Sequence, residues 1–400
     1  MKQKKNGRKI VYILLYVLIF LLLIGTSLYF FDKKKESNIP NDTIVEEKEP
    51  DVEEPKREEY NLRLGMIGDA LYHTGCYKDG LQSDGTYNFD KQLADITPIV
   101  RGYDLAYYNQ ETILGGVELE LSSYPNFNSP QEVGDAFVKA GFNLVSLANN
   151  HTLDKGQKAI LNSAQYWRKQ TNVMTAGSYD SFEDKARSHI GEKNGITYAF
   201  LAYTYGTNGI PVPKGKEYLV NLFDYEQARA DIEAVRDQVD VVLVSMHWGV
   251  EYTHVPTQEQ RKQAQFLSDL GVDVIIGSHP HVIQPIEHIG KTVVIYSLGN
   301  FISGQKEENQ RIGMIASVDI HKVVEDGVTT ISVDNVKGDL VYTERTAGFR
   351  NFRILPFYKM DNSILPNYIN VKTKYESIIN KTNDPNIQVG TLSSDDEVNI

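Results

Sequence analysis

A regular alternation of short apolar runs with amphipathic stretches is the feature that most constrains this fold. Amphipathic segments such as residues 129–141 and 257–271 begin at Ser or Thr caps and end at glycine, which is typical of helices. Strands that alternate with helices predict an α/β fold with largely parallel pairing. Each of six apolar runs stops abruptly at polar side chains: Asp69, Asn109 to Glu111, Asn149 to His151, His247 to Glu251, His279 to His281, and Asn300.

These polar clusters predict one convergent site, because the functional crevice of such sheets lies outside the carboxyl ends of the strands. Asp, Glu, Asn and His are ligand types of divalent transition metals. In "GSHPH", Pro280 biases His279 towards extended backbone, and side chains two residues apart in extended chain point the same way. The two imidazoles of His279 and His281 are therefore expected side by side.

Each cluster also has a purely structural explanation. Gly68-Asp69 is a common turn sequence, and Asp154 is a potential helix cap. His247 and Glu251 have the spacing of a helical pair. Trp248 and Phe301 are expected in the core. The conjunction of all six clusters favours the metal site over these separate explanations.

Composition excludes several classes of protein. The net charge of −12 argues against a nucleic-acid partner, since such proteins carry a basic face. The single cysteine, Cys76, excludes an intrachain disulfide and thiolate zinc clusters. Neither a Walker P-loop nor a G-x-S-x-G elbow occurs, so an ATP-driven ligase or a serine hydrolase of that type is not expected.

The N-terminus predicts a membrane anchor. A basic tail, residues 1–9, precedes an apolar run over residues 10–31, which as a helix is about 33 Å long and spans a hydrocarbon core of about 30 Å. The basic flank places the N-terminus in the cytoplasm and the rest outside the cell. Cleavage as a signal peptide is the alternative. The charged stretch over residues 32–60 is predicted to be a disordered linker.

The motifs "GD", "NQE", "LANNHTLDKG", "HWGVEY", "GSHPHV" and "SLGNF" resemble the series found in the poly-γ-glutamate capsule synthesis protein family, CapA. That family resembles the calcineurin-like metallophosphatases in fold. The resemblance runs from Leu62 to about Ile302. It implies a two-sheet α/β sandwich of the metallophosphatase-like type over residues 61–358, preceded by one transmembrane helix. Residues 328–344 are predicted to complete the second sheet, residues 350–359 to form an edge strand, and residues 359–400 to be a partly disordered extension.

The resemblance also implies roles at the site, for one or two divalent ions of Mn, Fe or Zn. His151 is the implied general acid, and Asp154 and Glu251 are predicted to assist catalysis. Two departures put the first metal position in doubt. Leu71 stands where metallophosphatases have a histidine, for which His73 is a candidate substitute, and Glu111 replaces a shorter aspartate. The implied metal ligands are Asp69, Glu111, Asn150, His247, His279 and His281.

Two functions are compatible with the sequence. The first is a membrane-anchored, extracellular, metal-dependent hydrolase or transferase of capsule biosynthesis. Its substrate would be an anionic envelope polymer, such as poly-γ-glutamate, attacked at a phosphoester or an amide. The second is a non-catalytic accessory subunit that keeps the fold and works with other capsule synthase subunits.

Overall fold

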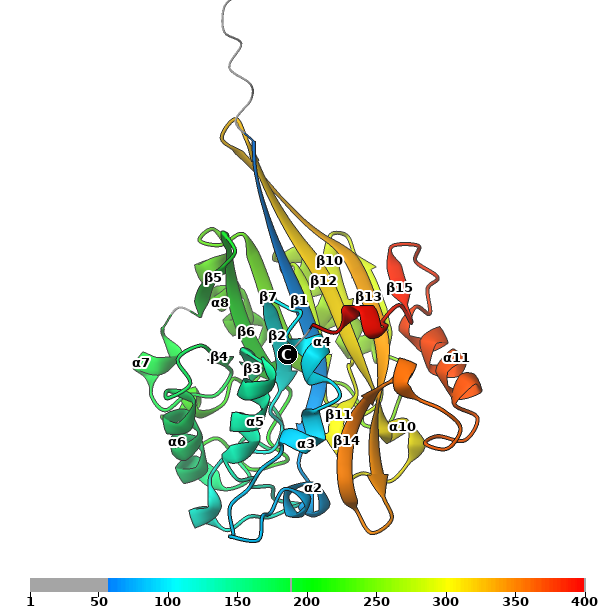
Figure 1. Ribbon diagram of the computed structural model, residues 1–400. Coiled ribbons are helices and arrows are strands. Elements are labelled where there is room, and N and C mark those ends of the chain that lie inside the picture. Colours follow the sequence, from blue (N-terminus) through cyan, green and yellow to red (C-terminus); the bar gives the residue numbers. More distant parts are fainter. Residues whose placement is uncertain (1–56, 188, 399–400) are drawn as a thin grey trace, which may run out of the picture. The chain divides into compact units, whose positions relative to one another are not determined.

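The strands of this protein form two sheets, seen in Figure 1 for a computed structural model that describes residues 57–187 and 189–398. The nine-stranded sheet has a main path of seven strands. In spatial order these are β14 (Arg350–Pro356), β13 (Val328–Thr346), β12 (Ile312–Glu325), β1 (Arg57–Leu71), β2 (Leu105–Asn109), β3 (Leu144–Ser146) and β4 (Met174–Ala176). Two further strands, β11 (Asn300–Ser303) and β15 (Ile387–Val389), pair with β1 and β13.

The six-stranded sheet packs against the first one. Its strands lie in the order β5 (Ile190–Lys193), β6 (Ile196–Thr204), β7 (Val241–His247), β8 (Val274–Ser278), β10 (Thr292–Ile295) and β9 (Ile286–Ile289). The core between the sheets takes Leu64 and Met66 from β1 and Leu243 and Ile276 from β7 and β8. The apolar runs predicted to be strands are continuous because both faces of each strand are buried, one against the other sheet and one against helices.

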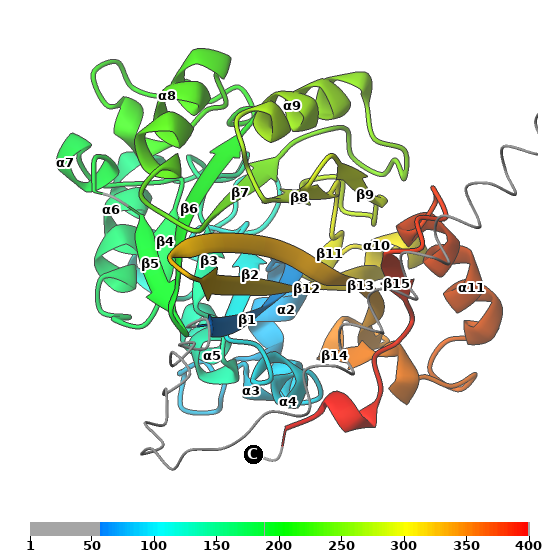
Figure 2. The ribbon, with the colours of Figure 1, turned by 90° about the horizontal axis from the view of Figure 1, so that it is seen from above.

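Helices cover the outer face of each sheet, so the fold has four layers (Figure 2). On the nine-stranded sheet lie α3 (Asp90–Leu93), α4 (Thr97–Val100) and α5 (Glu132–Ala140). On the six-stranded sheet, α8 (Tyr225–Arg236) and α9 (Gln258–Asp269) bury Ile232 and Leu267. Further helices are α2 (Thr74–Asp79), α6 (Gly156–Trp167), α7 (Phe182–Lys185), α10 (Glu308–Arg311) and α11 (Tyr368–Ile379).

Parallel pairing brings the strand ends to one edge. Asp69 is in register with Asn109 of β2 and with Asn300 of β11, and His247 is in register with Ser278 of β8. The prediction that the strand-end clusters converge is therefore confirmed at the level of the backbone.

Local signals located the helices well. The capping box of Thr257 and Gln260 begins α9 as predicted. Gly141 ends α5 in the left-handed conformation, with φ of 118°, where glycine is the favoured residue. The predicted start of α5 at Ser129 is wrong, because the first helical residue is Glu132.

Two predictions about the C-terminal part are wrong. The segment 328–344 lies in β13, and it extends the sheet that contains β1 instead of completing the other sheet. Its partners are β12 and β14, to which short hairpin turns connect it, and such connections favour antiparallel neighbours. The C-terminal extension is ordered up to residue 398, since α11 buries Tyr375 and Ile379 in the main core and β15 pairs with β13. The edge position predicted for β14 is correct.

The predicted anchor over residues 10–31 and most of the predicted linker lie outside the described residues. Strand β1 already begins at Arg57, inside the segment expected to be linker. Within residues 57–187 and 189–398, no helix has the length and apolar character needed to span a membrane.

Candidate metal centre

The centre lies where β1, β2, β7 and β8 end, and two of its carboxylates are fully buried. Asp69 and Glu111 both have an exposed fraction of 0%. Asn109, at the end of β2, donates from Nδ2 to Asp69 Oδ1 over 2.8 Å. An anionic oxygen out of contact with water needs hydrogen bonds or a cation to stabilise it. The burial of two carboxylates is therefore the first indication of a cation site.

One donor group consists of Asp69, Glu111 and His281, whose potential ligand atoms all lie within 4.8 Å of one another. His281 Nδ1 is 3.2 Å from Asp69 Oδ2, and His281 Nε2 is 3.6 Å from Glu111 Oε1. Two donors that bind one ion at about 2.1 Å each lie no more than about 4.2 Å apart. Both separations meet that condition. Asn300 Oδ1, 3.0 Å from His281 Nδ1, fixes the orientation of the ring.

A second set of donors surrounds the other side of Glu111. His247 Nε2 is 2.8 Å from Asn150 Oδ1 and 3.8 Å from Glu111 Oε1. Ser278 Oγ lies 2.9 Å from the other ring nitrogen, Nδ1, and thereby orients the imidazole. Such second contacts of a histidine are typical of metal ligands. Glu111 thus lies between two donor sets, where a bridging carboxylate would lie.

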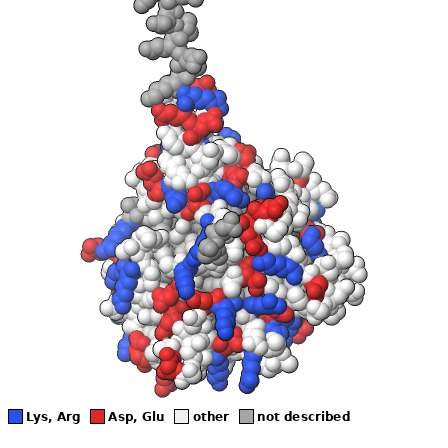
Figure 3. All heavy atoms as spheres, in the orientation of Figure 1, with Lys and Arg blue, Asp and Glu red and all other residues white. Residues whose placement is uncertain are grey.

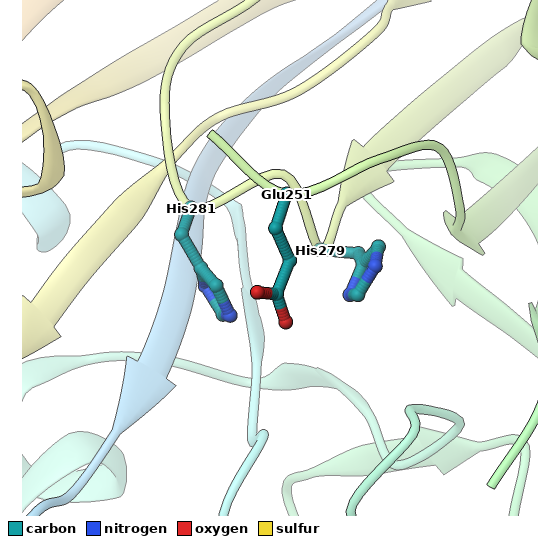
Figure 4. Close-up of side chains that lie close together, drawn as sticks. All are labelled: Glu251, His279 and His281. Carbon is teal, nitrogen blue, oxygen red and sulfur yellow. The ribbon is translucent and has the colours of Figure 1, made fainter. Parts of the chain in front are cut away.

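A third group, Glu251, His279 and His281, lies on the open side of the centre, with the Glu251 carboxylate between the two rings (Figure 4). The backbone N–H of Tyr252 donates to Pro280 O over 2.7 Å and holds this segment against the histidine loop. His279 and His281 have φ of 94° and 57°, a region that non-glycine residues rarely adopt, so the extended backbone predicted for His279 is wrong. Both histidines are therefore held in costly backbone conformations, which is common at functional sites.

The donor set fits a divalent cation. Among the described residues, the buried atoms Asp69 Oδ2, Glu111 Oε1, Glu111 Oε2 and His279 Nδ1 have no hydrogen-bond partner in the protein. His281 is close to Asp69 Oδ2, but the contact does not have the geometry of a hydrogen bond. Unpartnered buried groups of this kind are costly. A cation held by Asp69, Glu111 and His281 would give the unpartnered carboxylate oxygens a partner, and His279 belongs to the neighbouring donor group.

The pKa shifts follow from the burial of the centre. Burial, together with the charge of Asp69, raises the pKa of Glu111 well above its ordinary value. Burial and the neighbouring histidines lower the pKa of His247 well below its ordinary value and that of His279 to about 3. The two imidazoles are therefore neutral near pH 7, the form in which histidine binds metals.

His151 and Asp154 form a separate buried pair beside the centre. His151 Nδ1 lies 2.7 Å from Asp154 Oδ2, which also accepts a hydrogen bond from the backbone N–H of Phe127 over 2.6 Å. The Phe127 ring packs edge-on against the imidazole at 4.6 Å between centroids. Neither residue of the pair belongs to a donor group of the centre. His151 thus lies beside the candidate metal centre without belonging to its donor groups.

His73 does not join a donor group, although it was a candidate for the missing ligand. Its Nδ1 accepts from the backbone N–H of Gly304 over 3.2 Å, and its ring packs against Phe127. Burial lowers the pKa of His73 to about 4. Leu71 is buried as an ordinary apolar residue. The first metal position, which lacks a histidine at residue 71, thus gains no donor from residues 71–73.

Several residues of the centre were not identified as site residues from the sequence. Asn109 and Asn300 stand at strand ends, but the motif pattern assigns no role to them. Asn208 accepts from Asn150 Nδ2 over 3.2 Å, and the half-exposed Tyr205 ring lies 4.6 Å from the His279 ring. Both residues belong to the loop after β6. The apolar run before this loop does not end in Asp, Glu, Asn or His, so the pattern of strand ends that marks the other site residues does not mark these two.

Together, these features define a two-sheet α/β protein with a candidate divalent-metal centre at the carboxyl ends of its strands. The sequence profile of the family described as "Bacterial capsule synthesis protein PGA_cap" matches residues 63–305, and the chain belongs to this family. The prediction of the family from its motifs is confirmed.

Two relatives have closely related names. The chain is 34% identical over 264 residues to "PGA biosynthesis protein CapA" of Bacillus subtilis (strain 168), a match that covers 64% of this chain and 67% of the relative. It is 28% identical over 260 residues to "Capsule biosynthesis protein CapA" of Bacillus anthracis, covering 62% of this chain and 61% of that protein. The chain therefore spans less than two thirds of the second relative.

Among solved structures, a putative 5'-nucleotidase from Staphylococcus aureus in complex with alpha-ketoglutarate matches with a TM-score of 0.44 and 14% identity. That match covers 78% of this chain and 58% of the nucleotidase.

Proposed function

We propose that this protein is a membrane-anchored, extracellular, metal-dependent hydrolase or transferase of the metallophosphatase-like type, and that it acts on an anionic capsule polymer. The observation that carries the proposal is the set of buried carboxylate oxygens that lack protein partners while histidine and asparagine donors surround them.

The chain's own residues would hold one or two divalent ions. Asp69 and His281 would hold one position, Asn150, His247 and His279 the other, and Glu111 would lie between them. Ions there would polarise a phosphoryl or carbonyl oxygen and lower the pKa of water.

Glu251 takes a different role in this proposal from the catalytic one predicted from the sequence. Its carboxylate lies within 4.8 Å of ligand atoms of both His279 and His281. Leu71 leaves the first position one donor short, and Glu251 approaches that position from the open side. The geometry therefore favours Glu251 as the replacement ligand.

His151 would hold and deliver the proton in the reaction. Asp154 orients its ring through Nδ1, which leaves Nε2 as the atom that faces a leaving group. A positioned acid of this kind contributes roughly a hundredfold to ten-thousandfold in rate. This role belongs to the same proposal and rests on the placement of His151 beside the donor groups.

The substrate class is inferred from the names of the relatives. "PGA biosynthesis" and "capsule biosynthesis" support an anionic envelope polymer, with poly-γ-glutamate as the first choice. The direct test is incubation of the purified full-length chain with poly-γ-glutamate and with simple phosphoesters, in the presence of Mn²⁺, Fe²⁺ or Zn²⁺. Shortened polymer or released phosphate is expected from the native chain and not from Glu111→Gln. If neither substrate is altered with any of the metals while the native chain still restores capsule formation in cells, the accessory-subunit function is the better account.

The anchored, extracellular location is also a proposal, which rests on the apolar run over residues 10–31 and its basic flank. Protease added to intact cells is expected to digest the folded domain, whereas a cytoplasmic control protein stays whole. Complete protection of the domain in cells whose other surface proteins are digested would contradict it.

A further inference from the structure

A groove of about 820 Å³ lies beside the centre, between α2, the loop that follows Leu121 and the turn from β13 to β14. His73, Gly304 and Ser123 are among its lining residues. Lys78 of α2 and Arg350, at the start of β14, line it as well. Figure 3 shows Lys and Arg side chains (blue) at the lower edge of the molecule, where α2 and this turn lie in Figure 1.

Direct contacts connect this groove with the metal centre. The His73 ring packs against Phe127 at 5.1 Å between centroids, and Phe127 packs against His151 at 4.6 Å. A second connection runs through Gln305, the neighbour of Gly304, whose Oε1 accepts from Asn300 Nδ2 over 2.7 Å. Asn300 in turn contacts His281. The groove is thus connected to His281 through Gln305 and Asn300, and to His151 through Phe127.

The charges at the groove are mostly uncompensated cations. Lys78 and Arg350 are exposed, and neither forms an ion pair with any residue in the described part of the chain. The lining carboxylate of Asp79 remains negatively charged, but its oxygens are directed at the backbone N–H groups of Asn351 and Phe352, from which they accept hydrogen bonds over 2.6 and 2.9 Å.

A third cation, Arg345, lies behind Phe349, a lining residue. Its guanidinium stacks on the Phe349 ring at 3.9 Å from the centroid, and its Nη2 donates to Gln305 O over 3.0 Å. Its buried Nε has no hydrogen-bond partner among the described residues, and no carboxylate there pairs with it. In a chain with a net charge of −12, two cations thus line this groove and a third lies behind its wall, and none of the three forms an ion pair with a carboxylate of the described residues.

We infer that this groove is a subsite for the anionic polymer, in which Lys78 and Arg350, with the nearby charge of Arg345, bind carboxylates of chain units that flank the reacting unit. The inference rests on the proposed function for the class of polymer and on the groove itself for the location. Cations at fixed positions overcome the repulsion that the acidic molecule exerts on a polyanion, because salt screens that repulsion beyond about 8–10 Å.

The test measures binding of a fluorescently labelled oligo-γ-glutamate to the full-length chain in detergent micelles, by fluorescence anisotropy. Lys78→Glu combined with Arg350→Glu is expected to weaken binding at least about tenfold, since each position loses an attraction and gains a repulsion. The matched control, Lys169→Glu with Lys381→Glu, makes the same change in net charge at exposed lysines outside the groove. The control is expected to bind within about twofold of the native chain, because exposed charges at a distance are screened.

Equal weakening in both double variants would overturn the inference, because net charge and not the groove would then determine binding. A labelled polyphosphate serves as the second probe. If only polyphosphate binding falls in the groove variant, the assignment to a carboxylate polymer is wrong. Metal content is measured in every sample. If the groove variant binds oligo-γ-glutamate normally and the metal content still depends on the ligand histidines, the subsite alone is refuted. If the metal content does not depend on those histidines, the proposed function is refuted.

Discussion

At the scale of single residues, the pairing of His151 with Asp154 leads to the most specific prediction. His151→Ala is expected to keep its metal and its fold, because His151 is in none of the donor groups, and to lose roughly a hundredfold to ten-thousandfold in turnover. Metal analysis and the rate of polymer or phosphoester cleavage are the two measurements. His321→Ala, on β12 away from the centre, is the control. Loss of metal in proportion to activity would show that His151 is a ligand and contradict its assigned role.

Site residues could be predicted from the sequence where they follow an apolar run, and could not be predicted elsewhere. Asp69 and His247 were found because each ends an apolar run, and the structure brings both to one place. Tyr205 and Asn208 lie in a loop whose path depends on tertiary packing, so no periodic signal pointed to them. The place of Glu251 between two histidines depends on the path of the loop after β7, which the helical spacing of His247 and Glu251 did not indicate.

At the scale of elements, the end of β1 depends on a close approach between backbones. A Cβ at Gly68 would lie 1.8 Å from Gly299 O, the atom that accepts the hydrogen bond of the Asp69 N–H. Gly68→Ala must therefore push β1 away from the segment that leads into β11, at a cost of about 3 kcal/mol. Urea denaturation measures this cost, and Gly206→Ala, where a Cβ meets nothing within 4 Å, is the control. Equal stability of the two variants would contradict the close approach.

An ion pair ties the two sheets together and gives a prediction about pH. Lys322 Nζ of β12 lies 2.9 Å from Asp240 Oδ2, just before β7. Burial alone raises the pKa of Asp240, but hydrogen bonds from Lys322 and Thr197 outweigh it and bring the pKa below its ordinary value. A lowered folded-state pKa contributes stability above the unfolded-state value of about 3.9, and this contribution is lost as the pH falls through the folded-state pKa.

Asp240→Asn is therefore expected to destabilise the fold by about 1 kcal/mol near pH 7, and by less below about pH 4. Thermal or urea unfolding across this pH range gives the difference between the variant and the native chain. A difference that stays constant down to about pH 3 would mean that the Asp240 carboxylate contributes nothing through its charge.

At the scale of the whole molecule, the fold class and the convergence of strand ends followed from the alternation of strands and helices. The assignment of strands to sheets did not follow from it. Segment 328–344 shows alternation, but alternation does not reveal which sheet a strand joins, and hairpin connections placed β13 beside β12 in the sheet of β1. The C-terminal segment is ordered because α11 packs against the core. The weak helical pattern of this segment does not predict those contacts.

The central claim is that these strand ends form a divalent-metal centre, and elemental analysis of the purified full-length chain tests it most directly. The native chain is expected to contain Mn, Fe or Zn at near-stoichiometric levels, and the double variant His279→Ala with His281→Ala to contain little. Circular dichroism on both checks that the fold is retained. Metal content that is unchanged in the folded double variant, or a native chain that binds none of these ions when they are supplied, would contradict the claim.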